Sequence, residues 1–350
     1  MERAEPRTDE LWSTAEAMVV EGKGILAADE STGTIAKRLA SIGAENTEEN
    51  RRDYRELLFR TEGFERYISA VILFDETIRQ RAADGTPLVD LLTNLGVIPG
   101  IKVDAGAKPL AGAPEETVTE GLDGLRERLA EYRELGARFA KWRAVLHVGD
   151  GRPTGYAIDV NAHALARYAA LCQEAGLVPI VEPEVLMDGD HDIEDCFDAT
   201  EATLREVFYQ LAHQGVALES TILKPNMVLS GKAASARAAP DEVAEMTLAC
   251  FLQTVPAAVP GVAFLSGGQG DEESTRNLDA INRLANDIGA PWELTFSYGR
   301  GLQAAPLQAW GGKPENVAAA QRAFLHRARM VAAARDGAYE PEAEDEAVAP

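Results

Sequence analysis

Cysteine and histidine are scarce in this sequence, and the few that occur are scattered. The three cysteines, Cys172, Cys196 and Cys250, are odd in number, so we expect no disulfide framework and a reducing, cytoplasmic location. Metal sites usually space histidines so that two or more reach one ion. The five histidines lack such spacing; they are His147, His163, His191, His213 and His326. We therefore expect no metal site.

Positive charge and long apolar runs are also in short supply. The chain has 34 Lys and Arg against 57 Asp and Glu, which gives a formal net charge of −23. Such a surface repels nucleic-acid phosphates and acidic lipids, so we expect neither nucleic acid nor a membrane as a partner. No apolar run reaches the roughly 20 residues of a membrane-spanning helix. The first residues, MERAEPRTDELW, are charged, and we expect no secretory signal.

Lysine itself is rare, since only eight of the basic residues are lysines. Three of them, Lys102, Lys141 and Lys224, stand at the ends of apolar segments. Arginine stays protonated in proteins and cannot serve as an amine nucleophile. Lysines kept at these three positions therefore indicate amine chemistry or a need for compact positive charge.

Short apolar segments alternate with longer amphipathic ones along the chain. The apolar segments predict eight strands, at 24–29, 67–74, 98–104, 138–146, 177–186, 220–229, 261–267 and 292–298. Eight βα units predict an α/β fold, a closed (β/α)8 TIM barrel, and we assign it to residues 1–338. An open doubly wound sheet is the alternative, but the first strand lacks the glycine-rich turn of that fold. The acidic end, YEPEAEDEAVAP, is expected to form a mobile tail over residues 339–350.

Charged residues stand late in five of the predicted strands, where barrel enzymes carry their catalytic groups. These residues are Asp29, Lys102, Asp104, Lys141, Arg143, Glu182, Glu184 and Lys224. Positions two apart share a face of a strand, and neighbouring strands lie about 4.8 Å apart. The fourth, fifth and sixth strands should therefore bring Lys141, both glutamates and Lys224 together. A single charge there would be a solvated edge or a structural ion pair, but this many favour an active site.

Lys224 ends an apolar strand within STILKPNMVLSG and precedes Pro225. A free lysine is neutral in only about one molecule in 2,500 at pH 7. Desolvation and a nearby cation such as Lys141 both favour the neutral amine, and Pro225 keeps the preceding residue extended. We expect Lys224 to be a Schiff-base nucleophile that points into the barrel mouth. The alternative is a lysine whose ammonium merely reaches water from a strand end.

Two segments predict anion sites on opposite sides of the mouth. FLSGGQG and FSYGRG follow the seventh and eighth strands, the usual phosphate position in such barrels. DESTGTIAKRL follows the first strand and offers Ser31, Thr34 and Arg38, and Lys102 could reach it from the third strand. A helix N-cap would explain the two hydroxyls equally well. Two anion sites predict a substrate with two phosphates.

Together these motifs resemble class I (Schiff-base) fructose-bisphosphate aldolase over about residues 11–339. The matching stretches include GKGILAADESTGTIAKRL, VILFDETI, AKWRAVL, VEPEVL, LKPNMVLSG, FLSGGQ and FSYGRGLQ. The resemblance implies a TIM-barrel lyase of glycolysis and gluconeogenesis that reversibly cleaves fructose 1,6-bisphosphate into dihydroxyacetone phosphate and glyceraldehyde 3-phosphate. It also implies a homotetramer that needs no metal or other cofactor. A protonated imine can indeed stabilise the carbanion that carbon–carbon cleavage leaves.

The resemblance implies a role for each candidate residue. Lys224 forms the Schiff base, Glu182 is general acid and base, and Asp29 accepts the C4-hydroxyl proton. Lys141 assists through its charge, and Glu184 pairs with nearby cations. The C1-phosphate residues are Ser266, Gly267, Gly268, Ser297, Gly299 and Arg300. The C6-phosphate residues are Ser31, Thr34, Arg38 and Lys102, and Arg143 is a further substrate-binding candidate.

The sequence departs from the family pattern at two places. Thr34 stands where a serine is common, and its methyl group could tighten the phosphate site. The last tyrosine is Tyr339, whereas vertebrate members end in a tyrosine that reaches the active site. We therefore expect Glu182, or a water that it orients, to protonate the enamine. Sedoheptulose 1,7-bisphosphate stays open as a second substrate, and a transaldolase-like enzyme or a non-catalytic scaffold are the competing functions.

Overall fold

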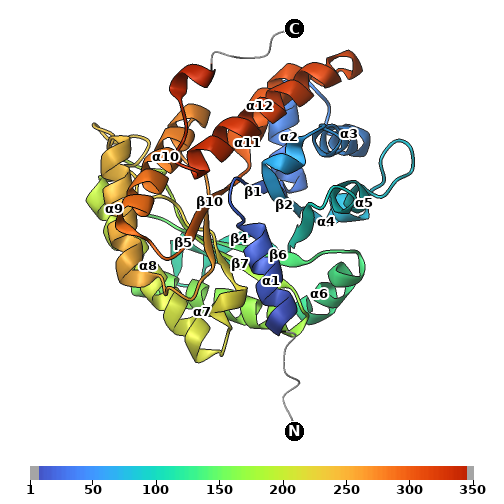
Figure 1. The fold of residues 1–350 in the computed structure, drawn as a ribbon. Coiled ribbons are helices and arrows are strands. Elements are labelled where there is room, and N and C mark those ends of the chain that lie inside the picture. The colour runs from blue at the N-terminus through green and yellow to red at the C-terminus, as the bar shows by residue number, and fades with distance from the viewer. Residues whose placement is uncertain (1–7, 345–350) are drawn as a thin grey trace.

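Eight parallel strands form a closed barrel in the computed structural model, which describes residues 8–344. The barrel strands are β1 (Gly24–Ala28), β2 (Ile68–Leu73), β3 (Ile98–Lys102), β6 (Phe139–Leu146), β7 (Val178–Val185), β8 (Ile222–Leu223), β9 (Gly261–Phe264) and β10 (Glu293–Tyr298). Each strand pairs with the barrel strands before and after it in the sequence, and β10 closes onto β1. The predicted (β/α)8 barrel is therefore confirmed, and the open doubly wound sheet is excluded (Figure 1).

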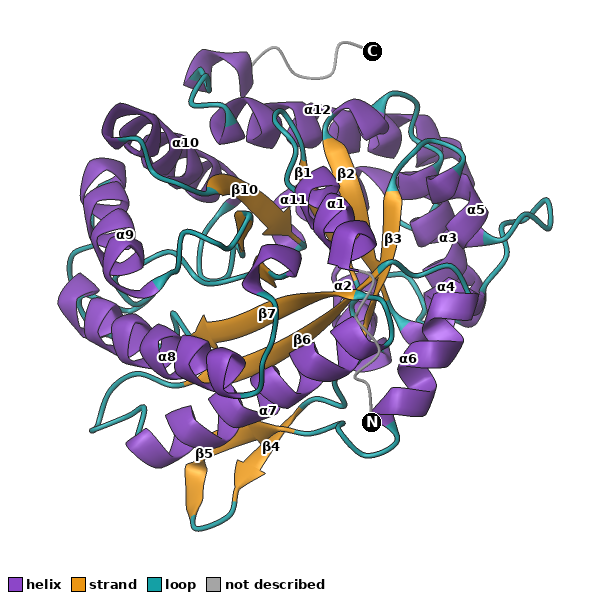
Figure 2. Ribbon diagram, turned by 60° about the horizontal axis from the view of Figure 1, so that its bottom comes forward, coloured by secondary structure: helices purple, strands orange, loops and turns teal. Residues whose placement is uncertain are grey.

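Helices surround the barrel, most of them in the connections between strands (Figures 1 and 2). They are α1 (Thr8–Met18), α2 (Thr32–Ser41), α3 (Glu48–Phe59), α4 (Asp75–Arg79), α5 (Leu88–Thr93), α6 (Leu125–Glu134), α7 (Gly155–Glu174), α8 (Ile193–His213), α9 (Pro240–Thr254), α10 (Asp271–Ile288), α11 (Arg300–Trp310) and α12 (Val317–Arg335), with short 3-10 turns at Phe64–Arg66, Leu218–Ser220, Pro314–Asn316 and Pro341–Glu344. Side-chain caps fix several starts; for example, Asp192 accepts a hydrogen bond from the amide of Asp195 at the start of α8. None of the described helices combines the length and apolar character needed to cross a membrane.

The inside of the barrel changes from apolar to charged along the strands. At the N-terminal end, Ile25, Phe139, Val178 and Ile222 pack in one cluster with residues of α1, which lies across that end (Figure 1). Side chains two positions apart along a strand share a face, so later residues on the same strands also point inward. These later inward positions carry the charged residues. The fold thus separates a packed core from a polar mouth along a single set of strands.

One hairpin was missing from the strand prediction. Strands β4 (Ala107–Leu110) and β5 (Ala113–Thr119) follow β3 and precede β6 in the sequence. They pair antiparallel outside the barrel (Figure 2). The hydroxyls of Thr117 and Thr119 donate to the carbonyls of Val145 and Arg143, which ties the hairpin to β6. Most of its residues are exposed or only half buried, so the apolar alternation that marks a strand with one buried face is weak there.

Strand β8 is much shorter than the predicted strand at 220–229. It spans two residues, although the amide of Lys224 still donates to the carbonyl of Val181 at 2.8 Å. Pro225 has no N–H and cannot continue the ladder. Strand β9 likewise ends at Phe264, before the predicted end at 267, because the chain turns through Gly267 and Gly268. In both cases the apolar run continues as buried but irregular chain.

The acidic C-terminal segment also needs correction where the structure describes it. We expected a mobile tail from residue 339, but Tyr339 is 3% exposed and its amide donates to Asp279. The tyrosine hydroxyl lies 3.0 Å from Glu344. Glu344 also forms an ion pair with Arg327 and lies 3.1 Å from Nε2 of His326. An aromatic anchor and a half-buried carboxylate thus hold this segment as far as Glu344. Residues 345–350 of the predicted tail lie outside the described residues.

Candidate active site

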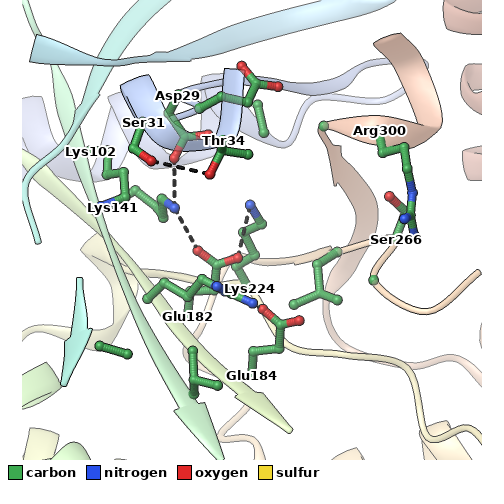
Figure 3. A pocket seen from close by; sticks show the side chains of 18 of the residues that line it. Asp29, Ser31, Thr34, Lys102, Lys141, Glu182, Glu184, Lys224, Ser266 and Arg300 are labelled. Atoms are coloured by element: carbon green, nitrogen blue, oxygen red, sulfur yellow. Dashed lines mark hydrogen bonds and ion pairs between the residues drawn. The ribbon is translucent and has the colours of Figure 1, made fainter. Parts of the chain in front are cut away.

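A cavity of about 990 Å³ opens at the C-terminal end of the barrel (Figure 3). All sixteen residues that the sequence suggested for the site line it. Its lining includes eight basic and six acidic residues, whereas the whole chain carries a net charge of −23. A cavity with more basic than acidic groups, inside an acidic protein, favours an anionic ligand.

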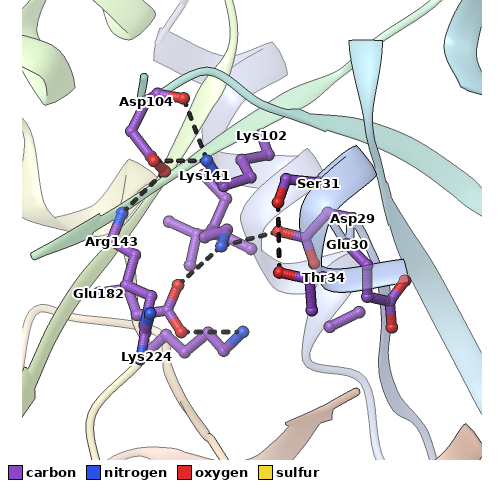
Figure 4. Close-up of polar contacts among 12 residues, drawn as sticks. Asp29, Glu30, Ser31, Thr34, Lys102, Asp104, Lys141, Arg143, Glu182 and Lys224 are labelled. Carbon is purple, nitrogen blue, oxygen red and sulfur yellow. Dashed lines mark hydrogen bonds and ion pairs between the residues drawn. The ribbon is translucent and has the colours of Figure 1, made fainter. Parts of the chain in front are cut away.

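Four charged side chains form a continuous chain of contacts at the floor of the cavity (Figures 3 and 4). The Nζ atom of Lys141 lies 2.7 Å from Oδ2 of Asp29 and 3.0 Å from Oε2 of Glu182. The Nζ atom of Lys224 lies 3.2 Å from Oε1 of the same Glu182. Lys141 and Glu182 form an ion pair, but the angles at this contact are not those of a hydrogen bond. Oε2 of Glu182 can therefore still accept a hydrogen bond from another donor.

Strand register explains why these groups meet. Arg143 on β6 stands opposite Glu182 on β7, so Lys141 and Glu182 are offset by two residues on neighbouring strands. Glu182 also follows Val181, which pairs with Leu223 immediately before Lys224. The sequence prediction that the fourth, fifth and sixth strands bring these charges together is confirmed. Asp29 joins them from the end of β1, across the barrel mouth.

The two carboxylates are held ionised by their neighbours. Burial raises the pKa of Asp29, but the charges of Lys141 and Lys224 outweigh burial and lower that pKa to about 2. Burial also raises the pKa of Glu182, and Lys141, Lys224 and Arg143 together bring it below its ordinary value. For Lys141, burial lowers the pKa, but Asp29 and Glu182 outweigh burial and raise it above its ordinary value. At neutral pH the site therefore presents two carboxylates and a permanently protonated Lys141.

A second group of charged residues lies beside these four side chains, on β3 and β6 and the segments that follow them. Arg143 pairs with Glu184. Lys102 pairs with Asp104 (Figure 4). The Asp104 carboxylate also accepts from the backbone amide of Arg143 at 3.3 Å. The pairing of Glu184 with a nearby cation agrees with the expectation from the sequence. Asp104 was noted on its strand but was not counted as a site residue.

The segment after β9 and the start of α11 form an open anion site, which we call the C1 loop site. It comprises Ser266, Gly267, Gly268, Ser297, Gly299 and Arg300. Within the described chain, the amides of Gly267 and Gly268 have no hydrogen-bond acceptor, and the buried hydroxyl of Ser297 has no partner. Gly268 has φ +82°, and a Cβ there would stand 2.4 Å from Cβ of Met187. Only glycine fits this turn, and it leaves donors pointing into the cavity.

The segment at the start of α2 forms a second anion site, which we call the α2 site. It comprises Ser31, Thr34, Arg38 and Lys102. The hydroxyls of Ser31 and Thr34 lie 3.2 Å apart, and Ser31 makes no capping bond to the helix. Ser31 thus stands at the N-cap position of α2, as the alternative explanation expected, but its hydroxyl does not cap the helix. Figure 3 shows Ser31 and Thr34 on one side of Lys224, with Ser266 and Arg300 on the other.

Other residues that line the cavity were not identified from the sequence. Glu30 follows β1 and forms ion pairs with Arg38 and Arg55. Lys232 lies beside Gly268 and pairs with Asp188. Adjacent charges in DES and a lone lysine in SGK carry no strand or spacing signal, so only the folded arrangement reveals them. Among residues 8–344, no group of three or more His, Cys, Asp or Glu side chains could hold a metal ion.

Comparison with known proteins identifies close relatives over nearly the whole length. A family model described as fructose-bisphosphate aldolase class-I matches residues 10–349. A probable fructose-bisphosphate aldolase class 1 from Xanthomonas campestris is 59% identical over 92% of this chain and 96% of its own length. Fructose-bisphosphate aldolase 6, cytosolic, from Arabidopsis thaliana is 56% identical over 96% of this chain and 93% of its own. A crystal structure of the Plasmodium falciparum fructose-bisphosphate aldolase, in complex with TRAP and a small-molecule inhibitor, is similar with a TM-score of 0.94 at 50% identity and covers 97% of this chain and 98% of its own.

Proposed function

The chain belongs to the class I fructose-bisphosphate aldolase family, and from this premise we propose how its residues carry out the cleavage. It is a carbon–carbon lyase of glycolysis that acts on fructose 1,6-bisphosphate. We propose that Lys224 forms a Schiff base with the C2 carbonyl of the ketose. The observation that carries this proposal is the unbroken contact from Asp29 through Lys141 and Glu182 to Lys224.

Glu182 is placed to handle the protons of Schiff-base formation. Lys224 must lose a proton before its nitrogen can attack, and Oε1 of Glu182 lies 3.2 Å away to accept it. The nitrogen then bonds to C2 and yields a carbinolamine. Protonated Glu182 returns the proton to the C2 hydroxyl, which leaves as water and gives the iminium. One carboxylate thus serves first as base and then as acid.

Asp29 is the base for the cleavage step. It takes the proton of the C4 hydroxyl while the C3–C4 bond breaks, and glyceraldehyde 3-phosphate leaves as the aldehyde. The electron pair of that bond moves into the iminium and forms an enamine, so no metal is needed as an electron sink. The pKa of Asp29 is about 2, because lysine charges outweigh the effect of burial. The phosphates of the substrate bring negative charge that raises this pKa and makes Asp29 a better base.

Enamine protonation requires a proton donor inside the mouth. Tyr339 is buried, and its hydroxyl is bonded to Glu344, so it is not available there. Our candidate donor is Glu182, or a water that it orients; because Glu182 gave up its proton in the dehydration step, it first takes a new proton from solvent. The iminium formed in this way is then hydrolysed by water, which releases dihydroxyacetone phosphate and frees Lys224.

The C1 loop site holds the phosphate that dihydroxyacetone phosphate keeps, and the α2 site holds the phosphate that leaves with the aldehyde. Arg143 and Glu184 form a pair on the cavity wall that limits where the substrate backbone can lie.

The test of this function is reductive trapping of the Schiff base. The protein is treated with borohydride and dihydroxyacetone phosphate, digested, and the modified lysine is mapped by mass spectrometry. We expect a single label on Lys224 and full activity in the presence of EDTA. Label on Lys102 or Lys141, with Lys224 untouched, would move the nucleophile elsewhere. Loss of activity in EDTA that zinc restores would contradict the metal-free mechanism.

We also propose a cytoplasmic homotetramer. The Arabidopsis relatives are named cytosolic, which supports the location. Large apolar side chains stand exposed on the outer helices, such as Tyr209 on α8 and Leu252 on α9, and such residues are suited to subunit contacts. Light scattering should give a mass four times the 37.6 kDa of one chain. A mass equal to one chain at micromolar concentration would refute the tetramer.

A further inference from the structure

Lys232 is a basic residue of the cavity lining, and it has no role in the mechanism proposed above. The chain reaches it from Lys224 through a wholly buried stretch, and the backbone around it is pinned to the segment after β7. The amide of Gly231 donates to the carbonyl of His191, and that of Lys232 to the carbonyl of Met187. A Cβ at Gly231 would stand 2.4 Å from the carbonyl oxygen of Gly189, so this approach allows only glycine. The base of the Lys232 side chain is therefore fixed in place.

The outer part of the Lys232 side chain lies over the C1 loop site. A Cβ at Gly268 would stand 3.6 Å from Cε of Lys232, and the ammonium is one bond further on. The ammonium pairs with Asp188 at 2.8 Å. Both side chains of this pair are about half exposed, at 45% and 63%, so water screens their attraction and the pair contributes little to holding the lysine. The ammonium can leave Asp188 without a large cost.

A phosphate in the C1 loop site would face two carboxylates as well as the donors of the loop. The Oε1 atom of Glu184 stands 3.0 Å from the place where a Cβ of Gly267 would lie. Glu184 is neutralised by Arg143, but Asp188 at the cavity rim has only the screened pair with Lys232. Arg300 donates to the carbonyl of Gln269, the residue after Gly268, at 3.4 Å. Of the basic residues in the lining, Lys232 has its side chain packed directly against Gly268, so its ammonium can add positive charge at this part of the loop.

We propose that Lys232 is a further phosphate-binding residue, which turns from Asp188 to the phosphate held by the C1 loop site. Asp188 acts as its resting partner when the site is empty. The proposal rests on the function assigned above, since it takes the C1 loop site as the place of the phosphate that dihydroxyacetone phosphate carries. It adds a second cation beside Gly268, so that the phosphate is held by Lys232 as well as by Arg300 and the donors of the loop.

The experiment measures dihydroxyacetone phosphate and glyceraldehyde 3-phosphate separately, because each carries one phosphate. Half-saturation by dihydroxyacetone phosphate is read from borohydride trapping, and KM for glyceraldehyde 3-phosphate from the condensation reaction. Lys232→Met keeps an unbranched stem over Gly268 and removes the charge. We expect the half-saturating concentration of dihydroxyacetone phosphate to rise about fivefold at low salt, and less at high salt. KM for glyceraldehyde 3-phosphate should stay within about twofold.

Three further variants make the result specific. Lys232→Arg keeps the charge and should restore binding to within about twofold of the wild type. Asp188→Asn releases the lysine and should lower the half-saturating concentration about twofold to threefold. Lys313→Met removes a charge from an exposed lysine between α11 and α12 and should change nothing. It controls for the change in net charge.

The outcomes separate this proposal from the one on which it rests. If Lys224 carries the label but Lys232→Met binds dihydroxyacetone phosphate normally, the role of Lys232 is refuted alone. An equal rise for glyceraldehyde 3-phosphate, or an equal effect in Lys313→Met, refutes it too, because the effect would then be general. If the wild-type label falls on another lysine, the proposed catalytic function fails whatever Lys232 does.

Discussion

The two anion sites of the mouth differ in the state of their donors. In the α2 site the cations already have carboxylate partners, since Arg38 pairs with Glu30 and Lys102 with Asp104. In the C1 loop site the donors are largely free, because the amides of Gly267 and Gly268 have no acceptor among the described residues. A phosphate that enters the α2 site must compete with protein carboxylates, whereas one that enters the C1 loop site meets groups with unmet hydrogen-bonding capacity.

The difference indicates separate tasks for two sites that recognise the same chemical group. Donors that have no protein partner and are already in position lose little free energy when a phosphate binds. The C1 loop site should therefore supply most of the affinity for the substrate. Glu30 is fully buried in the ion-pair cluster and also binds Arg55 and Gln303, which anchors Arg38 from three elements. A site whose charges are already balanced holds its phosphate more weakly. This suits the half of the substrate that must leave first as glyceraldehyde 3-phosphate.

The largest expected effect comes from removing the covalent link, which leaves the two anion sites alone to bind the substrate. Lys224→Met should lower kcat by about 10⁴-fold or more, because the other amine beside Glu182, that of Lys141, is kept protonated by Asp29 and Glu182 and cannot attack C2. Steady-state cleavage of fructose 1,6-bisphosphate measures this loss. Equilibrium binding of the bisphosphate to the same variant should persist, and its loss would mean that the phosphates are not held where we place them.

The next largest effect should come from the C1 loop site. Arg300→Ala removes the guanidinium at the start of α11 and should raise half-saturation by dihydroxyacetone phosphate about tenfold to thirtyfold. KM for the bisphosphate should rise in parallel, because both ligands use this site. Arg205→Ala on the outside of α8, where Arg205 pairs with Glu201, serves as the matched control. A normal affinity for dihydroxyacetone phosphate in Arg300→Ala would reverse our assignment of the two sites.

A smaller effect is expected in the α2 site. Arg38→Ala should raise KM for glyceraldehyde 3-phosphate about threefold to fivefold, since Arg38 is already neutralised by Glu30. Half-saturation by dihydroxyacetone phosphate should not change. The condensation reaction provides both quantities in one assay. An effect as large as that of Arg300→Ala would show that the prior pairing of Arg38 does not weaken the α2 site.

The smallest effect on catalysis should come from the C-terminal segment, whose described part is linked through Arg327 to the helix that follows the C1 loop site. Arg327 pairs with Glu344 and also bonds Thr275 near the start of α10, the helix that follows the C1 loop site. A chain that ends at Tyr339 loses Glu344, and its melting temperature should fall by about 2–5 °C. kcat and proton exchange of dihydroxyacetone phosphate should stay within about twofold. A chain that ends at Glu344 is the control, and a large fall in exchange would reveal a catalytic part for this segment.

Much of the site could be predicted from the sequence because strand geometry is so regular. The period of two along a strand predicts that Lys141 and Arg143 share a face, as do Glu182 and Glu184, and the register of β6 on β7 confirms it. Neighbouring βα units are neighbours in space, which is why Lys224 could be expected beside Glu182. These inferences need only the alternation of side chains and the order of the strands.

The partners of the α2 site and of Lys232 could not be predicted in this way. Whether Arg38 contacts Glu30 depends on how α2, α3 and α11 pack on the end of β1, and no local pattern encodes that arrangement. Lys232 reaches Gly268 only because two segments after β7 and β8 bind each other through their backbones. The hairpin β4–β5 was missed for a related reason, since its partly exposed strands carry no strong apolar pattern.

Lys141 also matters for the design of covalent reagents against this mouth. An aldehyde or an activated ester needs an amine with a free lone pair. Burial lowers the pKa of Lys141, but Asp29 and Glu182 outweigh burial and raise the pKa above its ordinary value, so the lone pair stays occupied by a proton at neutral pH. A reagent that reaches the floor of the cavity therefore does not react with Lys141. The carboxylates that pair with Lys141 thus protect it from electrophiles that enter the mouth.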